Sequence, residues 1–359
     1  MASTQADFYR GKRVLVTGHT GFKGAWLASW LKMLGARVVG VALPPEPDRP
    51  SLFQAADVAN GMHSVMGDIR DRSVLATVLK DHSPEIVFHL AAQSLVRRSY
   101  REPVETYATN VMGTAHLLEA VRQSPSVRAV VVVTSDKCYE NREWPHGYRE
   151  SDPLGGRDPY SSSKGCAEIV TAAYRASFFG PDAAAIASAR AGNVIGGGDW
   201  AEDRLIPDLF RGLAAGEPVI IRNPGATRPW QHVLEPLRGY LLLGERLWNR
   251  ADGVAEAWNF GPPDQNVVPV LELARSVLRY WGGGNLRVEA DPSAPHEAHF
   301  LRLDWGKARA GLGWQPFLTF DETVRLTVEW YRAYHDDSSA ASGRTRQQIE
   351  WYAARLPAG

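Results

Sequence analysis

The sequence predicts an α/β fold in which a doubly wound parallel sheet is followed by a smaller, mixed α/β lobe. Strand-like and helix-like segments alternate from residue 12 to about residue 190, as expected when helices join parallel strands. A glycine-rich loop follows the first of these strands. Beyond Asn193, stretches rich in glycine and proline break the alternation into short elements. We therefore expect a first domain over residues 1–190 and a substrate lobe over 191–359, with some chain crossing back.

The expected strands are short, largely apolar segments, which suits burial on both faces of a parallel sheet. They cover residues 13–16, 37–41, 63–66, 85–89, 129–134 and 184–190. The expected helices between them cover residues 22–34, 71–81, 103–122 and 159–178. In the second half, helices are expected at 268–280 and 321–334, the polar segment 336–346 is expected to be mobile, and a frayed helix is expected over 344–355. Open α/β sheets bind ligands at the carboxyl ends of their strands, so the second lobe should cover that edge.

Three glycines at regular spacing follow the first expected strand: Gly18, Gly21 and Gly24. The first permits a tight turn, the second lets backbone approach a pyrophosphate, and the third lets the next helix pack closely on the strand. A nucleotide-binding loop is one interpretation, and an ordinary turn between a strand and a helix is the other. A second motif, farther along the chain, favours the nucleotide-binding loop.

That second motif pairs Tyr160 with Lys164, 25 residues after Ser135. Residues four apart on a helix lie on one face, so the phenol and the ammonium group should be neighbours. An ammonium group stabilises a phenolate, and we expect it to lower the pKa of Tyr160 toward the working pH. Such a phenol can take a proton from a sugar hydroxyl while hydride leaves the same carbon.

The composition argues against several other classes of protein. Forty basic residues balance forty acidic ones, so no general affinity for nucleic acid or membranes is expected. No apolar run reaches the length of a membrane-spanning helix, and residues 1–11 lack the apolar core of a signal peptide. Cys138 and Cys166 are too few for a disulfide framework, which favours the cytoplasm. The ten histidines show no metal-ligand spacing, so no metal is expected.

The glycine spacing, the segment Leu90-Ala91-Ala92-Gln93 and the set Ser135, Tyr160 and Lys164 resemble the extended short-chain dehydrogenase/reductase family. The resemblance runs through nearly the whole chain, from residue 13 to about residue 330. It implies a Rossmann-type sheet, a nicotinamide cofactor and a nucleotide-sugar substrate. It also implies a homodimer built on the expected helices over 103–122 and 159–178.

The closer resemblance is to the CDP-glucose 4,6-dehydratase branch of this family. It rests on residues 134–139, 190–200, 228–233 and 295–298. The dTDP-glucose dehydratases carry Thr-Asp-Glu where this chain has Ser135-Asp136-Lys137, and the epimerases lack the acidic and basic pair. The resemblance implies oxidation of CDP-glucose at C4, loss of water across C5 and C6, and return of hydride to C6. Another nucleotide-sugar dehydratase or epimerase, or a non-catalytic NAD-binding regulator, stays open as an alternative.

By this resemblance Tyr160 is the base for the C4 oxidation, Lys164 supports it, and Ser135 bonds the same oxygen. Asp136, if protonated in a poorly solvated site, would donate to the leaving hydroxyl. Lys137 replaces a glutamate and is the candidate base at C5, provided that its pKa is depressed. A surface ion pair between Asp136 and Lys137 is the alternative interpretation, as is a Lys137 that only orients Asp136 or a water.

The implied cofactor is NAD, retained between turnovers. Its expected contacts are Gly18, Gly21, Phe22, Lys23, Gly24, Asp68, Ile69, Leu90, Ala91, Ala92, Thr109, Tyr160 and Lys164. Asp68 is an adenine contact by resemblance, and the N-cap of the next helix is an equally good interpretation. The acidic residue that would bind the ribose 2′-hydroxyl is missing, because residues 41–45 are Val-Ala-Leu-Pro-Pro.

A nucleotide diphosphate needs positive charge near the second lobe, and arginine matches phosphate geometry. Arg228 is the main candidate, because a proline and a tryptophan follow it directly in the sequence. The remaining expected substrate contacts are Gln93, Arg97, Asn193, Arg204, Arg222 and His296. A solvated surface position is the alternative for each of the other arginines.

Overall fold

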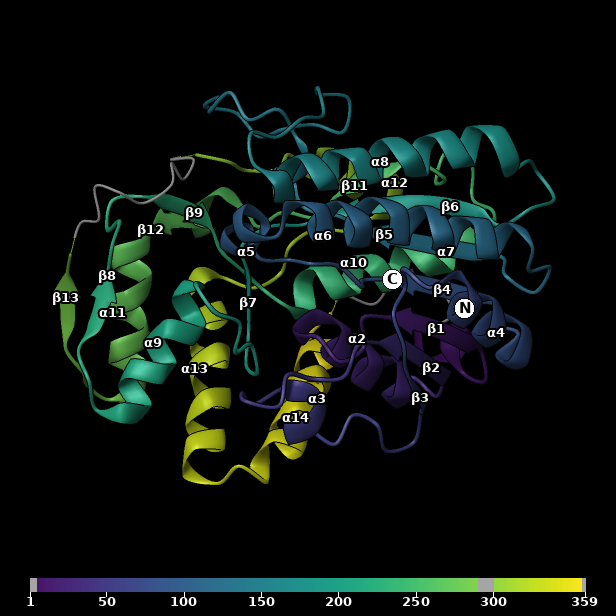
Figure 1. Cartoon of the computed structure of the whole chain (residues 1–359). Coiled ribbons are helices and arrows are strands. Elements are labelled where there is room, and N and C mark those ends of the chain that lie inside the picture. The colour runs from purple at the N-terminus through teal and green to yellow at the C-terminus, as the bar shows by residue number, and fades with distance from the viewer. Residues whose placement is uncertain (1–4, 290–299, 357–359) are drawn as a thin grey trace.

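The computed structural model describes residues 5–289 and 300–356, and it confirms the expected α/β architecture within them. A seven-stranded sheet runs through this part of the chain in the order β11-β6-β5-β4-β1-β2-β3 (Figure 1). Every pairing in it is parallel. Its strands are β1 (Arg13–Thr17), β2 (Arg37–Ala42), β3 (His63–Met66), β4 (Ile86–His89), β5 (Ala129–Val133), β6 (Ala185–Arg190) and β11 (Ala257–Asn259). The first six agree with the expected strands to within one residue at each end, whereas β11 was not expected.

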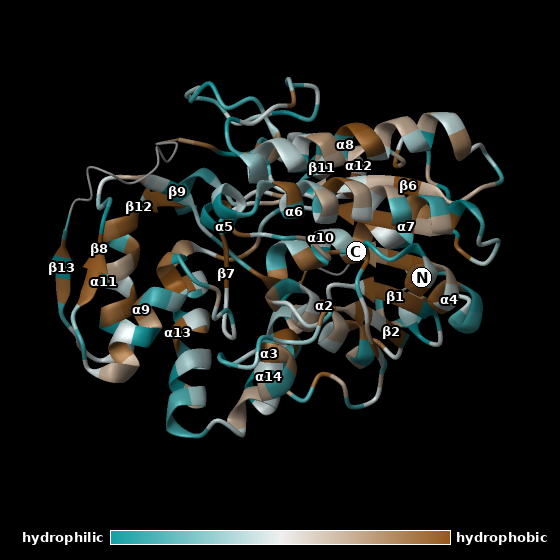
Figure 2. Cartoon of the chain, viewed as in Figure 1, coloured by the Kyte–Doolittle hydropathy of each residue, from teal (hydrophilic) through white to brown (hydrophobic). Residues whose placement is uncertain are grey.

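Helices cover both faces of the sheet, and each face has its own apolar core. Side chains alternate along a strand, so Val14 and Val16 enter one core while Leu15 enters the other. Figure 2 shows β1 in the hydrophobic colours, as expected for a strand buried on both sides. The covering helices are α2 (Phe22–Met33) and α10 (Leu234–Trp248) on the first face, and α4 (Arg72–His82), α7 (Gly113–Arg122) and α8 (Pro159–Phe178) on the second.

The helices expected over 22–34, 71–81 and 159–178 are confirmed, and the chain is also helical over the expected 103–122, although the middle of that segment is π-helical. That segment consists of α6 (Pro103–Tyr107), a π-helical turn at Ala108–Met112, and α7. The π turn contains Asn110, whose buried side-chain amide donates to the Gln93 carbonyl and to Ser163 Oγ. Wide turns of this kind often lie at functional sites, and this one joins a loop after β4 to α8.

The second half forms a lobe of helices and short paired strands beside the sheet (Figure 1). The expected helices over 268–280 and 321–334 are confirmed to within two residues at each end. The chain crosses back to the sheet at α10 and at β11, which pairs with β6. The other elements are α1 (Gln5–Tyr9), α3 (Leu52–Ala55), α5 (Val96–Arg101), β7 (Val194–Ile195), α9 (Leu205–Ala215), β8 (Val219–Ile221), β9 (Thr227–Pro229), β10 (Gln231–His232), β12 (Val267–Pro269), α11 (Val270–Trp281), β13 (Leu286–Val288), α12 (Gly306–Leu312) and α13 (Phe320–Asp336).

The expectation of a mobile segment over 336–346 is wrong, because α14 (Ala340–Ala354) begins within it. This helix packs against α2, where the Tyr352 ring meets the Trp30 ring edge-on at 5.8 Å between centroids. Thr345 Oγ1 accepts a hydrogen bond from the indole of Trp330 at 2.9 Å. Several of the side chains that α14 buries are polar, so no apolar stripe marks it in the sequence.

Glu235 on α10 connects three parts of the chain through one buried carboxylate. Its Oε1 accepts from the backbone N–H groups of Phe317 and Leu318, at 2.8 Å and 2.5 Å. Its Oε2 accepts from the Tyr352 hydroxyl on α14 at 2.9 Å. Burial raises the pKa of Glu235 to about 7, while these donors oppose the rise.

A carboxyl group with a raised pKa binds its proton more tightly in the folded than in the unfolded state. The contribution of Glu235 to the free energy of unfolding is therefore largest below pH 4.5, the ordinary pKa of a glutamate. It is lost as the pH rises from there to about 7, the pKa in the folded protein. Glu235→Gln cannot titrate, so we expect it to gain stability relative to the wild type across this window, by at most about 3 kcal/mol. Urea unfolding of both proteins at pH 5 and pH 8 measures the difference. Parallel pH profiles would contradict the assignment.

Candidate active site

The loop between β1 and α2 requires glycine at two of the three predicted positions. Gly18 has a φ of +78°, and a Cβ there would lie 2.7 Å from the backbone nitrogen of Ala91. A Cβ on Gly24 would lie 2.0 Å from the Gly18 carbonyl oxygen. Gly21 is the N-cap of α2, so the free N–H groups of the first helical turn lie directly after the loop. This close packing around a helix N-terminus fits a dinucleotide pyrophosphate.

The segment after β4 is fixed to the same loop by a chain of buried polar groups. Backbone N–H groups of Leu90 and Ala91 donate to Thr17, at its carbonyl and its hydroxyl. The Thr17 hydroxyl is also bonded to His89 Nδ1 at 2.7 Å, and His89 Nε2 is bonded to Thr114 Oγ1 at 3.1 Å. Burial lowers the pKa of His89 to about 3, so the imidazole is neutral near pH 7. The sequence analysis did not identify His89, which joins Thr17 at the end of β1 to Thr114 on α7.

The predicted adenine contact lies at the end of β3. The Asp68 carboxylate accepts from the backbone and the guanidinium of Arg70, and this hydrogen bonding lowers the pKa of Asp68. The N-cap of α4 is Asp71, so the interpretation of Asp68 as that N-cap is wrong. Ile69 is buried close to Gly113, where a Cβ would lie 2.5 Å from the isoleucine Cδ1.

Ser135, Tyr160 and Lys164 lie at the carboxyl end of β5, as the family resemblance implied. Ser135 caps a short 3-10 turn after the strand, and all three side chains are buried. The first turn of α8 is set by Asp158, which caps Ser161, and by a proline at the first helical position. The backbone N–H of Tyr160 also donates to Ser99 Oγ at 3.1 Å.

The direction expected for the pKa of Tyr160 is wrong in this arrangement. Burial raises the pKa of Tyr160 to about 12, and a hydrogen bond with Ser135 and the charge of Arg204 oppose the rise. Lys164 does not lower it, because its ammonium group donates instead to a backbone carbonyl of β5 at 3.5 Å. Burial lowers the pKa of Lys164 to about 8, against the attraction of Glu168. Tyr160 therefore needs a proton acceptor or an additional positive charge before it can act as a base.

Asp136 is held in place from several sides. Its Oδ1 accepts from the Ser135 hydroxyl at 2.9 Å, and its Oδ2 accepts from the Asn193 amide at 3.3 Å. Gly192 faces the carboxylate so closely that a Cβ there would lie 1.9 Å from Oδ2. Lys137 is half-buried, and its ammonium group has no partner within the part of the chain that the structure describes. A surface ion pair between Asp136 and Lys137 is therefore not formed.

The side chain of Lys23 joins this group, which the sequence analysis missed. Its ammonium group lies 5.9 Å from the centroid of the Tyr240 ring on α10. Burial lowers the pKa of Lys23 to about 7, and the charges of Lys164 and Arg204 lower it further while Asp136 opposes them. The sequence placed Lys23 only in the cofactor loop, because the contact with α10 depends on chain more than two hundred residues away.

Gln93 is hydrogen-bonded to the π turn, and Thr109 lies within that turn. The Gln93 amide donates to the Leu95 carbonyl and to Thr106 Oγ1, and its oxygen accepts from the Leu95 N–H at 2.6 Å. These bonds occupy the side chain within the protein, so a contact with the hexose stays a prediction. Thr109 is half-buried next to Asn110.

The structure brings three of the four predicted arginines together around a single loop. Arg97 and Arg222 both reach Asp203 Oδ1, at 3.2 Å and 4.0 Å. Arg204 pairs with Asp199 at 3.0 Å and is one of the charges that act on Tyr160. Arg228 lies apart on β9 and donates to a neighbouring backbone carbonyl at 3.0 Å. His296 lies outside the described residues.

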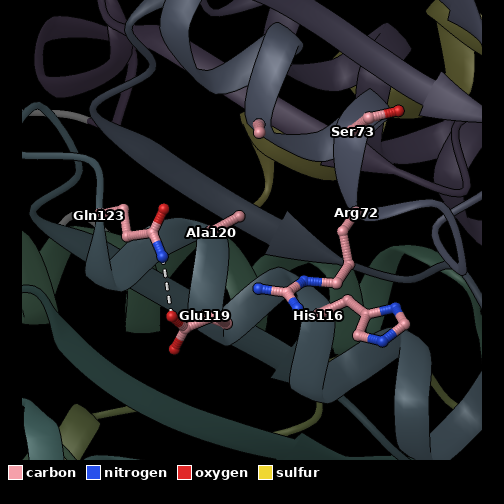
Figure 3. Close-up of a pocket in the computed structure, with 7 residues that line it drawn as sticks. Arg72, Ser73, His116, Glu119, Ala120 and Gln123 are labelled. Atoms are coloured by element: carbon pink, nitrogen blue, oxygen red, sulfur yellow. Dashed lines mark hydrogen bonds between the residues drawn. The ribbon is translucent and has the colours of Figure 1, made fainter.

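A surface hollow of about 370 Å³ between α4 and α7 is separate from these groups (Figure 3). Arg72, His116 and Glu119 line it, and Glu119 is bonded to Gln123 across one side. None of the predicted site residues lines this hollow. Among the described residues, no cluster of histidine, cysteine and acidic side chains is arranged to hold a metal ion, and no helix is long and apolar enough to cross a bilayer.

Comparison with known proteins extends over nearly the whole chain. The CDP-glucose 4,6-dehydratase of Salmonella typhimurium is 52% identical over 333 residues, which make up 91% of this chain and 92% of that protein. An epimerase from Methanothermobacter thermautotrophicus has a TM-score of 0.79 at 26% identity, covering 93% of this chain and 96% of that one. The dTDP-glucose 4,6-dehydratase DesIV of Streptomyces venezuelae, solved with NAD, has a TM-score of 0.76 at 27% identity, covering 89% and 97%.

Residues 15–327 match the family profile described as GDP-mannose 4,6 dehydratase. This match covers most of the chain and includes the glycine loop, Ser135, Asp136, Tyr160 and Lys164. The chain therefore belongs to this family of NAD-dependent nucleotide-sugar dehydratases and epimerases.

Proposed function

We propose that the protein is a CDP-glucose 4,6-dehydratase that converts CDP-glucose into CDP-4-dehydro-6-deoxyglucose and water, with NAD as its cofactor. The observation that carries this proposal is the 52% identity to the Salmonella typhimurium enzyme over 91% of the chain. The site supports it, because Asp136 and Lys137 directly follow Ser135, and the charge of Asp136 acts on Tyr160. An epimerase needs no such acid and base pair.

Bound NAD supplies the hydride acceptor for oxidation at C4 and the hydride donor for C6. Its expected place is the loop around Gly18 and Gly24, whose close backbone packing leaves no room for side chains there. Tyr160 takes the proton of the C4 hydroxyl, and Ser135 bonds the same oxygen. The raised pKa of Tyr160 is lowered when a positively charged nicotinamide lies near the phenol.

The ketone formed at C4 acidifies the proton on C5, so the C6 hydroxyl can leave. Asp136 donates a proton to that hydroxyl, because it is buried and held toward the cleft by Asn193 and Gly192. Lys137, as the neutral amine, takes the C5 proton and becomes an ammonium group; its side-chain nitrogen has no partner among the described residues that would occupy its lone pair. The same lysine returns a proton to C5 when C6 is reduced.

The diphosphate of the substrate is proposed to bind the arginines of the second lobe and its border. Arg97, Arg204 and Arg222 gather near the loop that contains Asp203, and arginine forks match phosphate oxygens. Arg228 on β9 is the proposed contact farther from the sugar.

We further propose a homodimer that acts in the cytoplasm. Large apolar side chains are exposed on neighbouring helices along one side of the sheet, and Val104 is 81% exposed. Exposed apolar patches of this kind mark protein interfaces. Both cysteines are free thiols, which suits a reducing compartment. A solution mass near that of one 39.5-kDa chain would contradict the dimer. The exposed apolar residues on these helices are Tyr100, Val104, Tyr107, Met112, Ile169 and Phe178.

A panel of CDP-, dTDP-, GDP- and UDP-glucose tests the proposed function. We expect CDP-glucose to be converted at least ~10-fold more efficiently than the other three, since the resemblance is to the CDP-specific branch. The product is measured by the ultraviolet absorbance that 4-keto-6-deoxy sugars develop in alkali. Formation of a CDP-hexose epimer without this absorbance would replace the dehydratase with an epimerase.

Two substitutions separate the oxidation from the elimination. We expect Tyr160→Phe to lose both steps and to lower kcat by ~10²-fold or more, because it removes the base.

We expect Asp136→Asn to accumulate reduced cofactor, read at its own absorbance band, and to stall before water is lost. A variant of Asp136 that stalls before the cofactor is reduced would show that this division of roles is incorrect.

The packing of Gly192 on Asp136 makes a third prediction. A Cβ at residue 192 would lie 2.0 Å from Asp136 Cγ, so Gly192→Ala must displace the carboxylate. We expect kcat to fall by ~10²-fold while NAD affinity, measured by calorimetry, stays within a few-fold. Gly180→Ala is the matched control, since nothing lies within 4 Å of its added Cβ. Wild-type turnover in Gly192→Ala would mean that the position of Asp136 is not critical.

A further inference from the structure

Asn193 has a backbone conformation that few side chains adopt. Its φ is +49°, in the left-handed region. Its side-chain amide donates to Asp136 Oδ2 at 3.3 Å, and the preceding Gly192 packs against the same carboxylate. A residue other than glycine persists in this region where its surroundings hold it there, and such residues cluster at active sites. The contacts of Asp136 with this turn therefore depend on whatever fixes the backbone of Asn193.

Gln231, the first residue of β10, is bonded to the peptide groups on both sides of Asn193. Its side-chain Nε2 donates to the Gly192 carbonyl at 3.0 Å, and its backbone N–H donates to the Asn193 carbonyl at 3.2 Å. The first carbonyl belongs to the peptide group before Asn193, and the second belongs to the peptide group after it. Because peptide groups are planar, fixing both of them fixes the φ and ψ of the residue between them.

The same side-chain amide connects this turn to the last strand of the sheet. β6 and β11 are parallel neighbours, and the Phe260 N–H donates to the Arg190 carbonyl at 2.8 Å where the two strands end. Beyond that bond, Gln231 Nε2 donates to the Phe260 carbonyl at 3.0 Å. One amide nitrogen therefore uses both of its N–H groups to hold the two segments that leave the sheet.

A glutamine at this position carries a cost in stability. The Gln231 side chain is 1% exposed, and its Oε1 has no hydrogen-bond partner in the described part of the chain. A buried acceptor without a partner destabilises a folded protein. An apolar side chain would avoid that cost, but it would provide no donor for the carbonyls of Gly192 and Phe260. The two donors are therefore what this glutamine contributes.

We propose that Gln231 is a positioning residue for the elimination step: it holds Asn193 in its left-handed conformation and thereby keeps the carboxyl group of Asp136 directed at the C6 hydroxyl. This inference rests on the proposed dehydratase function. Gln231 acts through the backbone of the turn. A displaced Asp136 slows the loss of the C6 hydroxyl, whereas the oxidation at C4 proceeds, because Tyr160 and the cofactor carry that step.

The variant Gln231→Met tests this role, since methionine has a similar length but no donor. After the enzyme with its cofactor is mixed with CDP-glucose, we expect reduced cofactor to form within ~3-fold of the wild-type rate, followed by stopped-flow absorbance. The reduced cofactor should then persist, and kcat should fall by ~10- to 10²-fold, because a small misplacement of a reacting group is costly. An unchanged kcat, or equal slowing of oxidation and turnover, would overturn the proposal.

Gln348→Met is the matched control. Gln348 on α14 is also a buried glutamine, its amide donates to the Leu326 carbonyl at 2.7 Å, and its Oε1 lacks a partner among the described residues. We expect this variant to lose thermal stability without accumulating reduced cofactor. If Gln231→Met does not fold, Gln231→Asn keeps a shorter amide that cannot hold both carbonyls, and it should accumulate reduced cofactor to a smaller extent. No accumulation in Gln231→Asn would then overturn the proposal.

A double-mutant cycle separates positioning of Asp136 from general damage. If Gln231 acts through Asp136, Gln231→Met should lower kcat by less than ~2-fold in the Asp136→Asn background. The same loss of ~10-fold or more in both backgrounds would show that the two residues act independently, and the proposal would be wrong. A wild-type enzyme that forms no 4-keto-6-deoxy product from CDP-glucose would instead refute the proposed function.

Discussion

The buried ion pair between Glu168 and Arg190 holds together the elements that carry the proposed catalytic side chains. Arg190, at the end of β6, donates to Glu168 on α8 at 2.8 Å, and both side chains are about 3% exposed. Glu168 also accepts from Thr134 at the end of β5 and from Ser188 on β6. Burial would raise the pKa of Glu168, but Arg190 and these hydroxyl donors reverse the shift and keep it ionised. Removing one member of such a pair leaves an uncompensated buried charge, which costs ~3–5 kcal/mol.

The same pair reaches the second half of the chain. Arg190 donates to the Tyr139 hydroxyl at 2.6 Å, and Tyr139 donates to the Asn259 side chain on β11. The site is therefore assembled by chain from both halves: β5 and α8 supply the reactive groups, and β11 and α10 complete the sheet and its cover. Lys23 and Tyr240 meet across this junction. One buried network thus joins β11, in the second half of the chain, to β6 and α8 in the first half.

Much of the first half was predictable, because buried parallel strands are apolar on both faces and have little freedom in length. The start of α8 was predictable from Pro159, a favoured first residue of a helix. The π turn was not, because Asn110 bonds partners from two other segments. The helix expected over 344–355 is present as α14, but its start at Ala340 was not predictable, because α14 buries polar side chains such as Gln348 and has no apolar stripe.

The proposed catalytic residues were also only partly predictable from the sequence. Spacing placed Tyr160 and Lys164 on one helix face, and the family resemblance placed Ser135 beside them. The raised pKa of Tyr160 was not predictable, because burial depends on the whole assembled cleft rather than on a neighbour four residues away. The place of Lys23 likewise depends on α10. His89 gave no signal as a lone histidine, and only the structure shows that it lies between two threonines.

The proposed phosphate site already contains an anion, the carboxylate of Asp203. Its carboxylate, on a residue with a φ of +57°, already lies against Arg97 and Arg222. An incoming diphosphate must displace this internal anion, so the affinity measured is a difference between two anions competing for the same cations. A group with a single negative charge gains little from that exchange, whereas a diphosphate carries more charge than the carboxylate it replaces. On this proposal the loop favours ligands that carry more than one negative charge. When no substrate is bound, Asp203 pairs with the two arginines, so fewer unpaired cations are exposed to inorganic anions.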